Sequence, residues 1–333
     1  MCSDADHGGA TALAAIHPDI IQSHILNRLD GPTLASTSCA SAQFLSLCAE
    51  DLLWRQICNA TWPSTAHPTV RAAISAFPSA HRSFYSDSFP AVARQGGASP
   101  LRRRAPPQQA TQTLISAVDV YCDDKLIYSR VKETETRSGW FQSSPFRIDL
   151  VDPKEAVAAP LRFDGEDGAC MELARERLRL SWILIDPAKG RAVNVASAAA
   201  VEARRHWLTE DIQLRYATVV DAGNGELVQC AAVVTCGGKD GGELQVREIS
   251  MQVEDMEGKI LTGSHSLGIL DAAMEGRRLK SHVGMQREAY QMFLRMKIQS
   301  RERKQRRERS LDIVCIAAGV AIFVAIWTFL LSR

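Results

Sequence analysis

The chain ends in a long uncharged, apolar segment, Ile313–Leu331, which constrains the fold more than any other feature. Its roughly 19 residues would form a helix of about 28 Å, close to the thickness of a hydrocarbon core. Eleven of them are Ile, Val, Leu or Phe, and at about 0.3 to 0.6 kcal/mol each these favour insertion by roughly 3 to 7 kcal/mol. We therefore predict a transmembrane helix; the alternative is a terminal helix buried in a soluble core.

Basic residues immediately precede this segment and predict its orientation, because positive charges favour the cytosolic side of a membrane. Only Ser332 and Arg333 follow the apolar segment. We therefore expect a tail anchor that inserts after translation, with the N-terminus in the cytosol, in the endoplasmic reticulum or another endomembrane. Attraction to anionic lipid would add about 1 kcal/mol per basic residue near the surface; the alternative is that these residues only fix the orientation. The orienting residues are Arg301, Arg303, Lys304, Arg306, Arg307 and Arg309.

The composition excludes several classes of protein. A hydrophobic content of 46% is sufficient for a folded core, and a net charge of +1 gives no general attraction to nucleic acid. The nine cysteines include no Cys-x-x-Cys pair and no His/Cys set with zinc-finger spacing. The N-terminus lacks the basic and apolar regions of a signal peptide. We expect reduced thiols in the cytosol, with no metal site, cofactor or disulfide framework.

The middle of the chain alternates with a period of two, which predicts β-strands. Leu178, Leu180, Trp182 and Leu184 point to one side, and the strand becomes apolar on both sides at its end, as a central strand would. Repeated hairpin turns, including Asn224-Gly225, favour an antiparallel sandwich over a doubly wound sheet. A slip of phase at Arg247-Glu248 predicts a β-bulge.

The motifs that could carry catalysis have simpler interpretations. Gly237–Gly242 contains glycines and a lysine but not the order of a phosphate loop, and it predicts a hairpin turn. Asp164–Gly168 lacks the spacing and final glutamate of a calcium loop and predicts an acidic turn. His206-Trp207 is interpreted as a packed aromatic pair rather than a catalytic base. We therefore predict no catalytic residues.

The N-terminal stretch Pro18–Trp54 predicts short helices with an apolar side. Ile21, Ile25 and Leu29 follow a helical period, with Ile20 and Leu26 beside them. Pro18 and Asp19 suit the first turn of this helix, and Thr33 is the expected cap of the next. A segment this short buries little surface by itself, so its apolar side is expected to bind a partner. The alternative is an ordinary hairpin within a larger helical domain.

The same stretch resembles an F-box, the module by which substrate receptors bind the Skp-type adaptor of cullin-RING ubiquitin ligases. Two positions depart from the pattern: His17 stands where the family usually has Leu, and Ser41-Ala42-Gln43 replaces a basic and aromatic stretch. The resemblance implies a helix-in-groove interface with the adaptor. Pro32 also matches the pattern, and the adaptor-binding residues it implies are Pro18, Ile20, Ile21, Ile25, Leu26, Leu29, Leu34 and Trp54.

Beyond this module, the chain resembles a plant F-box subfamily with a C-terminal transmembrane anchor. The resemblance is carried by TWPSTAHP, HRSFYSDSFP and SGWFQSSPFRIDLVDPKE. The middle region also resembles, more faintly, a phloem-lectin type of sandwich, through LSWILIDP and SGWF. The family implies a non-catalytic receptor that brings an unknown protein substrate to a ligase at a membrane. The alternative function is a membrane-anchored lectin-like or protein-binding module with no ligase role.

The expected fold is therefore α+β and multidomain: a small helical F-box, an antiparallel β-sandwich, and a long helix leading into one transmembrane helix. The expected divisions are a disordered tail at 1–12, the F-box at 13–62, a linker region at 63–112, the sandwich at 113–262, a helical juxtamembrane segment at 263–310 and the tail anchor at 311–333. Within the linker region, a short helix is expected at Val70–Phe77, and His81–Phe89 is expected to pack on the F-box.

Overall fold

The computed structural model describes residues 17–89, 112–152, 154–163, 168–222, 226–238, 241–276 and 283–332. Several predictions lie wholly or mostly outside these residues: the disordered tail, the Ala91–Ala110 part of the linker, the Asn224-Gly225 turn and the acidic turn at Asp164–Gly168.

The N-terminal region, residues 17–89, is helical. Its first three segments follow one another without a break, and they pass from α-helix through a π-helix to a 3₁₀-helix. The segments are α2 (Pro18–Ile20), η1 (Ile21–Ile25), η2 (Leu26–Arg28), α3 (Gly31–Thr37), α4 (Ala42–Leu47), α5 (Asp51–Thr61), η3 (Pro63–Ala66), α6 (Pro68–Ile74) and α7 (Ala80–Ser88).

The first of these segments divides its apolar residues between the interior and the surface. A period of 3.6 would place Ile21, Ile25 and Leu29 together, but η1 is a π-helix, in which residues five apart lie above one another. Ile21 and Leu26 are accordingly the buried pair, at 1% and 0% exposure, whereas Ile25 is 43% exposed. The predicted apolar side is therefore not one continuous face.

The start of α3 also differs from the prediction. Asp30 rather than Thr33 is the N-cap: its carboxylate accepts a hydrogen bond from the Thr33 amide at 2.9 Å. Hydrogen bonds from the side chain and backbone of Thr33 lower the pKa of Asp30. Pro32 lies in the first turn, where its missing N–H costs nothing.

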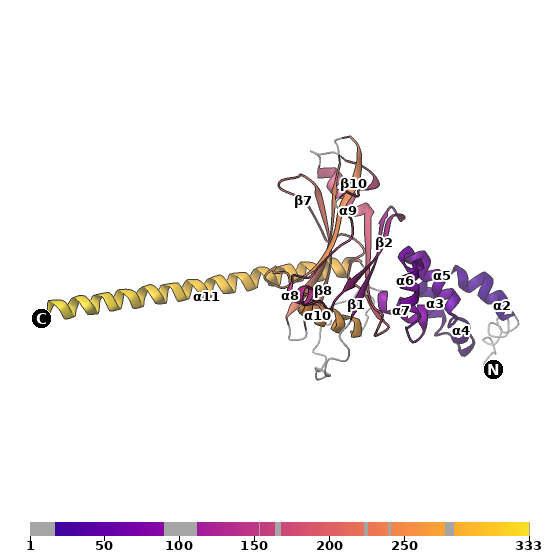
Figure 1. The fold of residues 1–333 in the computed structure, drawn as a ribbon, viewed down its shortest axis with the longest axis horizontal. Coiled ribbons are helices and arrows are strands. Elements are labelled where there is room, and N and C mark those ends of the chain that lie inside the picture. The colour runs from indigo at the N-terminus through magenta and orange to yellow at the C-terminus, as the bar shows by residue number, and fades with distance from the viewer. Residues whose placement is uncertain are drawn as a thin grey trace, which may run out of the picture.

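The middle region forms two antiparallel sheets (Figure 1). In the four-stranded sheet the order is β2 (Lys125–Glu135), β1 (Thr113–Cys122), β5 (Leu178–Asp186) and β6 (Arg191–Asn194). In the six-stranded sheet it is β3 (Arg147–Asp149), β10 (Glu243–Glu254), β9 (Leu227–Gly237), β8 (Ile212–Asp221) and β7 (Glu202–Arg205), with β4 (Val157–Arg162) also paired to β10. Two helices lie between strands, α8 (Gly139–Ser143) and α9 (Gly168–Arg177).

The strand predictions are confirmed in several particulars. β5 is internal in its sheet, between β1 and β6, as its apolar pattern predicted. The register of β10 on β9 shifts between Val246 and Glu248, where the change of phase predicted a bulge. β9, which ends at Gly237, pairs antiparallel with β10, which begins at Glu243, so the strands on either side of the glycine-rich stretch form a hairpin, as predicted, and no helix directly follows it. Lys239 and Asp240 lie outside the described residues.

The two sheets share one hydrophobic core. Trp182 on β5 and Tyr216 on β8 are both fully buried in it. The Tyr216 hydroxyl donates to the carbonyl of Leu178 at 3.0 Å, which joins the six-stranded sheet to the four-stranded one. Each sheet therefore packs one apolar face against the other sheet, as strands with alternating apolar and polar residues require.

The opposite face of the four-stranded sheet packs against the N-terminal helices. Ile183, Ile185 and Ala192 on this face belong to the same buried cluster as Ile74 and Phe84 of α6 and α7. This explains why β5 is apolar on both sides. The expected packing of the His81–Phe89 stretch on the N-terminal helices is also observed, because Phe84 and Tyr85 lie in that cluster with Trp54 and Trp62.

Polar contacts reinforce this junction. Asp119 of β1 is fully buried and accepts hydrogen bonds from the Ser64 amide at 2.9 Å, the Ser64 hydroxyl at 2.6 Å and the Ser129 hydroxyl at 2.7 Å. Arg191 of β6 pairs with Asp87 of α7 at 2.8 Å. The helical region and the first sheet thus share a continuous interior.

Two helices complete the chain, α10 (Gly263–Glu275) and α11 (Val283–Leu331). The first part of α11 packs on the six-stranded sheet: Tyr290 is buried against Ala217, and Phe293 against Val219. At 1.5 Å per residue its 49 residues span about 74 Å, so most of the helix extends beyond the sheets. The N-terminal helices and the free end of α11 lie on opposite sides of the β region (Figure 1).

Candidate docking surface

The eight residues predicted to bind an adaptor divide into two groups. Four of them lie in the interior of the helical region, at 0 to 2% exposure: Ile21, Leu26, Leu34 and Trp54. Leu29 is half-buried, and Pro18, Ile20 and Ile25 are exposed. In this conformation only the exposed members can touch a partner directly, while the buried ones form the support beneath them.

Trp54 packs at the centre of the helical region. Its indole Nε1 donates to the carbonyl of Cys48 at 2.7 Å, and its ring lies 5.3 Å from that of Tyr85. Tyr85 in turn covers Gly31, where a Cβ atom would overlap the tyrosine ring. Burial raises the pKa of Tyr85 well above its ordinary range, so its ring packs as a neutral phenol. Gly31 is therefore required by close packing at the start of α3.

The outer surface of the same helices carries large apolar side chains. Ile20 is 50% exposed, Leu45 48% and Leu52 60%, and with Ile25 we call these four residues the outer apolar set. The sequence did not identify Leu45 and Leu52 as docking residues. Neighbouring residues on a helix point about 100° apart, so the three apolar residues Leu52, Leu53 and Trp54 cannot all face the core. Leu53 and Trp54 do, and Leu52 is exposed. This apolar triplet was a usable signal.

The positions that depart from the F-box pattern act as helix caps. His17 is the N-cap of α2, where its Nδ1 accepts a hydrogen bond from the Asp19 amide at 3.3 Å. Ser41 is the N-cap of α4, where its hydroxyl accepts from the Phe44 amide at 3.2 Å. Each departure therefore satisfies a backbone N–H at a helix start.

The titratable groups inside the helical region hold it together and offer no nucleophile. Asp51 of α5 accepts a hydrogen bond from the His81 amide at 2.9 Å and lies 2.9 Å from the His81 ring, which joins α5 to α7. Burial raises the pKa of the Cys58 thiol to about 12. A thiol in that state carries almost no thiolate at neutral pH, so it cannot act as a reactive cysteine.

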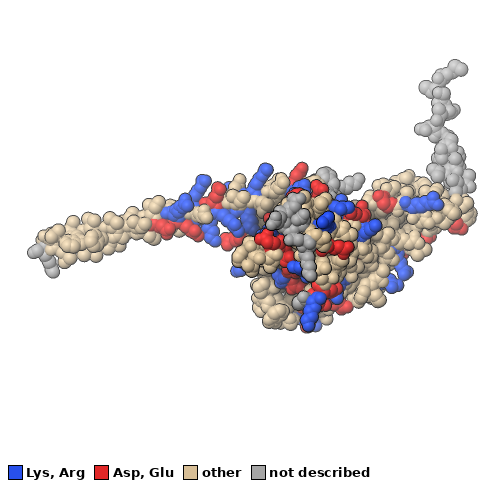
Figure 2. Space-filling view, turned by 90° about the horizontal axis from the view of Figure 1, so that it is seen from above, with Lys and Arg blue, Asp and Glu red and all other residues tan. Residues whose placement is uncertain are grey.

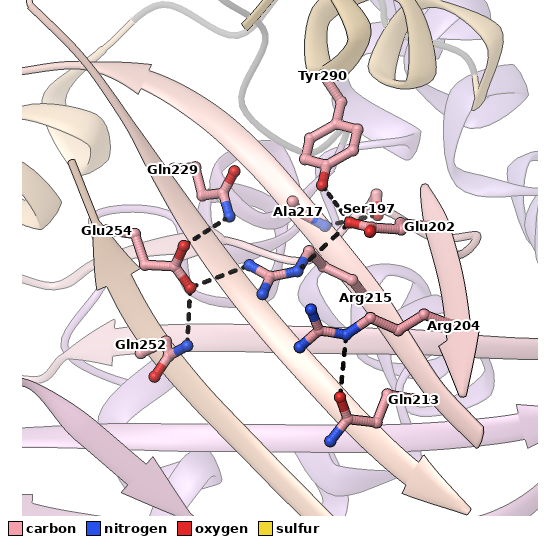
Figure 3. Close-up of polar contacts among 10 residues, drawn as sticks. All are labelled: Ser197, Glu202, Arg204, Gln213, Arg215, Ala217, Gln229, Gln252, Glu254 and Tyr290. Carbon is pink, nitrogen blue, oxygen red and sulfur yellow. Dashed lines mark hydrogen bonds and ion pairs between the residues drawn. The ribbon is translucent and has the colours of Figure 1, made fainter. Parts of the chain in front are cut away.

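A polar cluster joins α11 to the outer face of the six-stranded sheet (Figure 3). The Tyr290 hydroxyl donates to Glu202 at 2.6 Å, and Arg215 pairs with Glu254 at 3.0 Å. Gln229 and Gln252 donate to the same Glu254 carboxylate. Arg215 is paired with both Glu254 and Glu202, and these contacts position the helix on the sheet.

The basic residues before the apolar segment also divide into two groups. Arg301 donates to the carbonyl of Glu257 at 2.8 Å, and Lys304 pairs with the Glu257 carboxylate at 2.9 Å. The other four predicted orienting residues, Arg303, Arg306, Arg307 and Arg309, are exposed. Figure 2 shows these Lys and Arg side chains gathered where α11 leaves the β region, followed by a segment without charge.

Among the described residues, α11 is the one helix long and apolar enough to cross a membrane. Its most apolar window has a mean hydropathy of 2.7, and none of that window is buried within the protein. The alternative prediction, a terminal helix buried in a soluble core, is wrong for this arrangement of the chain. Its length and composition are compatible with a membrane span.

The aromatic pair His206-Trp207 differs from the prediction. The two rings stack, with centroids 6.2 Å apart and planes at 28°, but Trp207 is 82% exposed. The pair was expected to be packed into the protein, and instead it lies at the surface. The residues that the structure describes contain no cluster of His, Cys, Asp and Glu that could hold a metal ion.

Comparison with known proteins identifies the family. The chain is 45% identical over 337 aligned residues to F-box protein At2g27310 of Arabidopsis thaliana, covering 97% of both chains. It is 42% identical to Probable F-box protein At2g36090 (96% of this chain, 94% of the relative) and 38% identical to F-box protein At3g44326 (95% and 89%), both from the same plant. No family model and no solved structure matches. With relatives this similar along nearly its whole length, the chain belongs to the F-box proteins.

Proposed function

We propose that this F-box protein is the substrate-recognition subunit of a Skp–cullin–F-box ubiquitin ligase, held at the cytosolic face of a membrane by α11. F-box proteins are non-catalytic subunits, so the chain itself is not an enzyme. The observation that carries the proposal is the near full-length similarity to F-box proteins. Exposed apolar residues on the helical region support it, because an interface needs large side chains that are available to a partner.

The mechanism is one of proximity. A receptor that holds its substrate beside a charged conjugating enzyme raises the effective concentration of the two reactants without any catalytic group of its own. The shared interior of the helical region and the first sheet supports such a role, since it fixes the adaptor-binding end relative to the β region. A fixed geometry keeps this effective concentration higher than a flexible connection would, because less conformational freedom is lost on binding.

The adaptor interface can be tested with residues of the outer apolar set. Ile20→Asp and Ile25→Asp should each weaken binding of a purified Skp-type adaptor to the full chain about tenfold or more, because each places an unpaired charge in an apolar contact. The melting temperature should hardly change, because both side chains are already exposed. A pull-down titration in detergent micelles measures the first quantity, and differential scanning fluorimetry the second.

Leu126→Asp is a matched control, because Leu126 on β2 is as exposed as Ile25, at 43%. It should leave adaptor binding unchanged. If wild-type chain shows no affinity for the adaptor, or if Ile25→Asp binds as well as wild type, the ligase role fails. The alternative of a membrane-anchored binding module without ligase function would then be favoured.

The membrane anchor is a separate part of the proposal. The apolar window of α11 is unburied within the protein, and transfer of its Ile, Val, Leu and Phe residues favours insertion by roughly 3 to 7 kcal/mol. The full chain should stay in the membrane pellet after carbonate extraction, whereas a variant with Val320 and Val324 both changed to Arg should be released. Release of the wild-type chain would refute the anchor and leave the adaptor test unaffected.

A further inference from the structure

The loop between β7 and β8, His206–Asp211, exposes two large apolar side chains to solvent. Trp207 is 82% exposed and Leu208 is 68% exposed. Burying a side chain of this size is worth roughly 1.5 to 3 kcal/mol, so the loop leaves a favourable interaction unused. Tryptophan is also among the residues that most often dominate the free energy of protein–protein binding. Such a pair at the apex of a loop is suited to contact a partner.

The loop is held in one conformation by its own hydrogen bonds. The His206 amide donates to the Asp211 carbonyl at 2.8 Å, and the Glu210 amide donates to the His206 carbonyl at 3.0 Å. The His206 Nδ1 accepts from the Thr209 amide at 3.3 Å, and an ion pair of 2.9 Å joins Asp211 to Arg247 of β10. Trp207 and Leu208 are therefore presented by a pre-ordered turn, which reduces the entropy lost on binding.

A positive charge lies next to this loop. Arg204 of β7 donates to the neutral side-chain oxygen of Gln213 at 3.1 Å (Figure 3). Its neighbour Arg215 is compensated by Glu254 and Glu202. Within the described part of the chain, Arg204 has no such carboxylate partner. Three positions before Trp207, β7 therefore carries a guanidinium group that pairs with no carboxylate among the described residues.

We propose that Arg204, Trp207 and Leu208 form a recognition site for an extended polypeptide segment of the ligase substrate. The segment carries an aromatic or aliphatic side chain that packs on Trp207 and Leu208, and a carboxylate that pairs with Arg204. Arg204 and Trp207 are three positions apart in the chain, a span of at most about 10 Å. The two side chains of the ligand are accordingly no more than about three positions apart.

The position of this site suits a substrate receptor. β7 belongs to the six-stranded sheet, whereas the N-terminal helices cover the four-stranded one. A polypeptide on the His206–Asp211 loop and an adaptor on the outer apolar set therefore contact different parts of the molecule and can bind together. This inference rests on the proposed ligase role, because it assigns the bound polypeptide to the substrate.

The test uses the full chain in detergent micelles and a set of fluorescent 12-residue peptides. Each peptide has one Phe or Leu and one Glu in a Gly-Ser background, with one to five positions between them in separate members. Fluorescence anisotropy should give the tightest binding to the peptides with one or two positions between the two residues. The double variant Trp207→Ser, Leu208→Ser should weaken that binding about tenfold or more.

A change of charge tests Arg204 without removing the apolar contact. Arg204→Glu should lose affinity for the Glu peptides and gain affinity for otherwise identical Lys peptides, because it reverses the sign of the pairing group. Trp140→Ser is the matched control: Trp140 on α8 is 79% exposed, almost as much as Trp207. This variant should bind within twofold of wild type.

Three results would overturn the proposal. These are an absence of peptide binding above background, equal binding by the Trp207→Ser, Leu208→Ser variant, and an Arg204→Glu variant that keeps its preference for Glu peptides. Loss of vesicle partitioning by the double variant with unchanged peptide binding would assign the loop to lipid and also overturn it. Adaptor binding is measured on the same samples, so failure of the peptide site alone leaves the ligase role standing.

Discussion

The junction between the helical region and the β region can be tested quantitatively by substituting Asp119. Its carboxylate accepts three hydrogen bonds, two from Ser64 of η3 and one from Ser129 of β2. Asp119→Ala removes all three acceptors and leaves the buried Ser64 amide without a partner, at a cost of about 1 to 3 kcal/mol for that group alone. With the lost hydroxyl contacts, we expect destabilisation of about 3 kcal/mol. Asp119→Asn keeps one acceptor for the amide and should cost about 1 kcal/mol.

The pH dependence provides a second readout of the same residue. Burial raises the pKa of Asp119 above its usual value near 3.8, against the effect of its hydrogen bonds. The folded state therefore keeps a proton that the unfolded state releases, so the free energy of unfolding falls as pH rises from about 3.8 to the folded pKa. Asp119→Asn cannot titrate and should lack this component of the slope.

Urea unfolding of the full chain in micelles, followed by tryptophan fluorescence, measures both effects. Trp62 and Trp182 are buried on the two sides of the junction, and a single transition is expected because the regions share an interior. Ser64→Ala is the control, since it removes one hydroxyl contact and keeps the hydrogen bond from the residue-64 amide to Asp119. If Asp119→Ala costs no more than Ser64→Ala, or if the two regions unfold in separate steps, the coupling described here is wrong.

Three further predictions concern single positions. Gly31→Ala should destabilise the chain by about 1 to 3 kcal/mol, because its Cβ overlaps the Tyr85 ring, and calorimetry should show part of that loss recovered in a Tyr85→Leu background. Cys58, with its pKa near 12, should stay unlabelled by maleimide at pH 8 in the folded chain, as read by peptide mass spectrometry. Phe293→Ala should cost about 3 to 5 kcal/mol and increase hydrogen exchange in the first turns of α11, since Phe293 is fully buried against the sheet.

The strands could be predicted well from the sequence because the alternation of apolar and polar residues within each strand shows which of its faces is buried. Alternation along β5 indicated its inward face, and the slip of phase in β10 indicated a bulge, with no knowledge of the partner strands. The π-turn at η1 was not predictable in the same way. Apolar residues occur at both Ile25 and Leu26, so a spacing of four and a spacing of five fit the pattern equally, and packing against Leu34 and Trp54 decides between them.

The candidate site was predicted as a set of residues without their division of roles. A pattern of apolar positions does not separate the side chains that support a surface from those that form it, and here Ile21 and Ile25 differ in exactly that respect. The exposed position of Trp207 was missed for a related reason. An aromatic pair beside a strand usually packs inward, and the hydrogen bonds that turn this loop outward involve backbone groups that have no signature in the sequence.

The apolar residues on the outer side of β5 could have predicted a second packing partner, which was not inferred from the sequence. Ile183 and Ile185 required a cover on that face, and the helices from Pro63 to Ser88 provide it. Because the same helices hold Trp54 and Tyr85 in place, the support of the outer apolar set depends on the first sheet. The helical region therefore shares its core with the β region, and part of its stability comes from packing on the first sheet. A change that loosens β1 or β5 should weaken adaptor binding from a distance, without any contact with the adaptor.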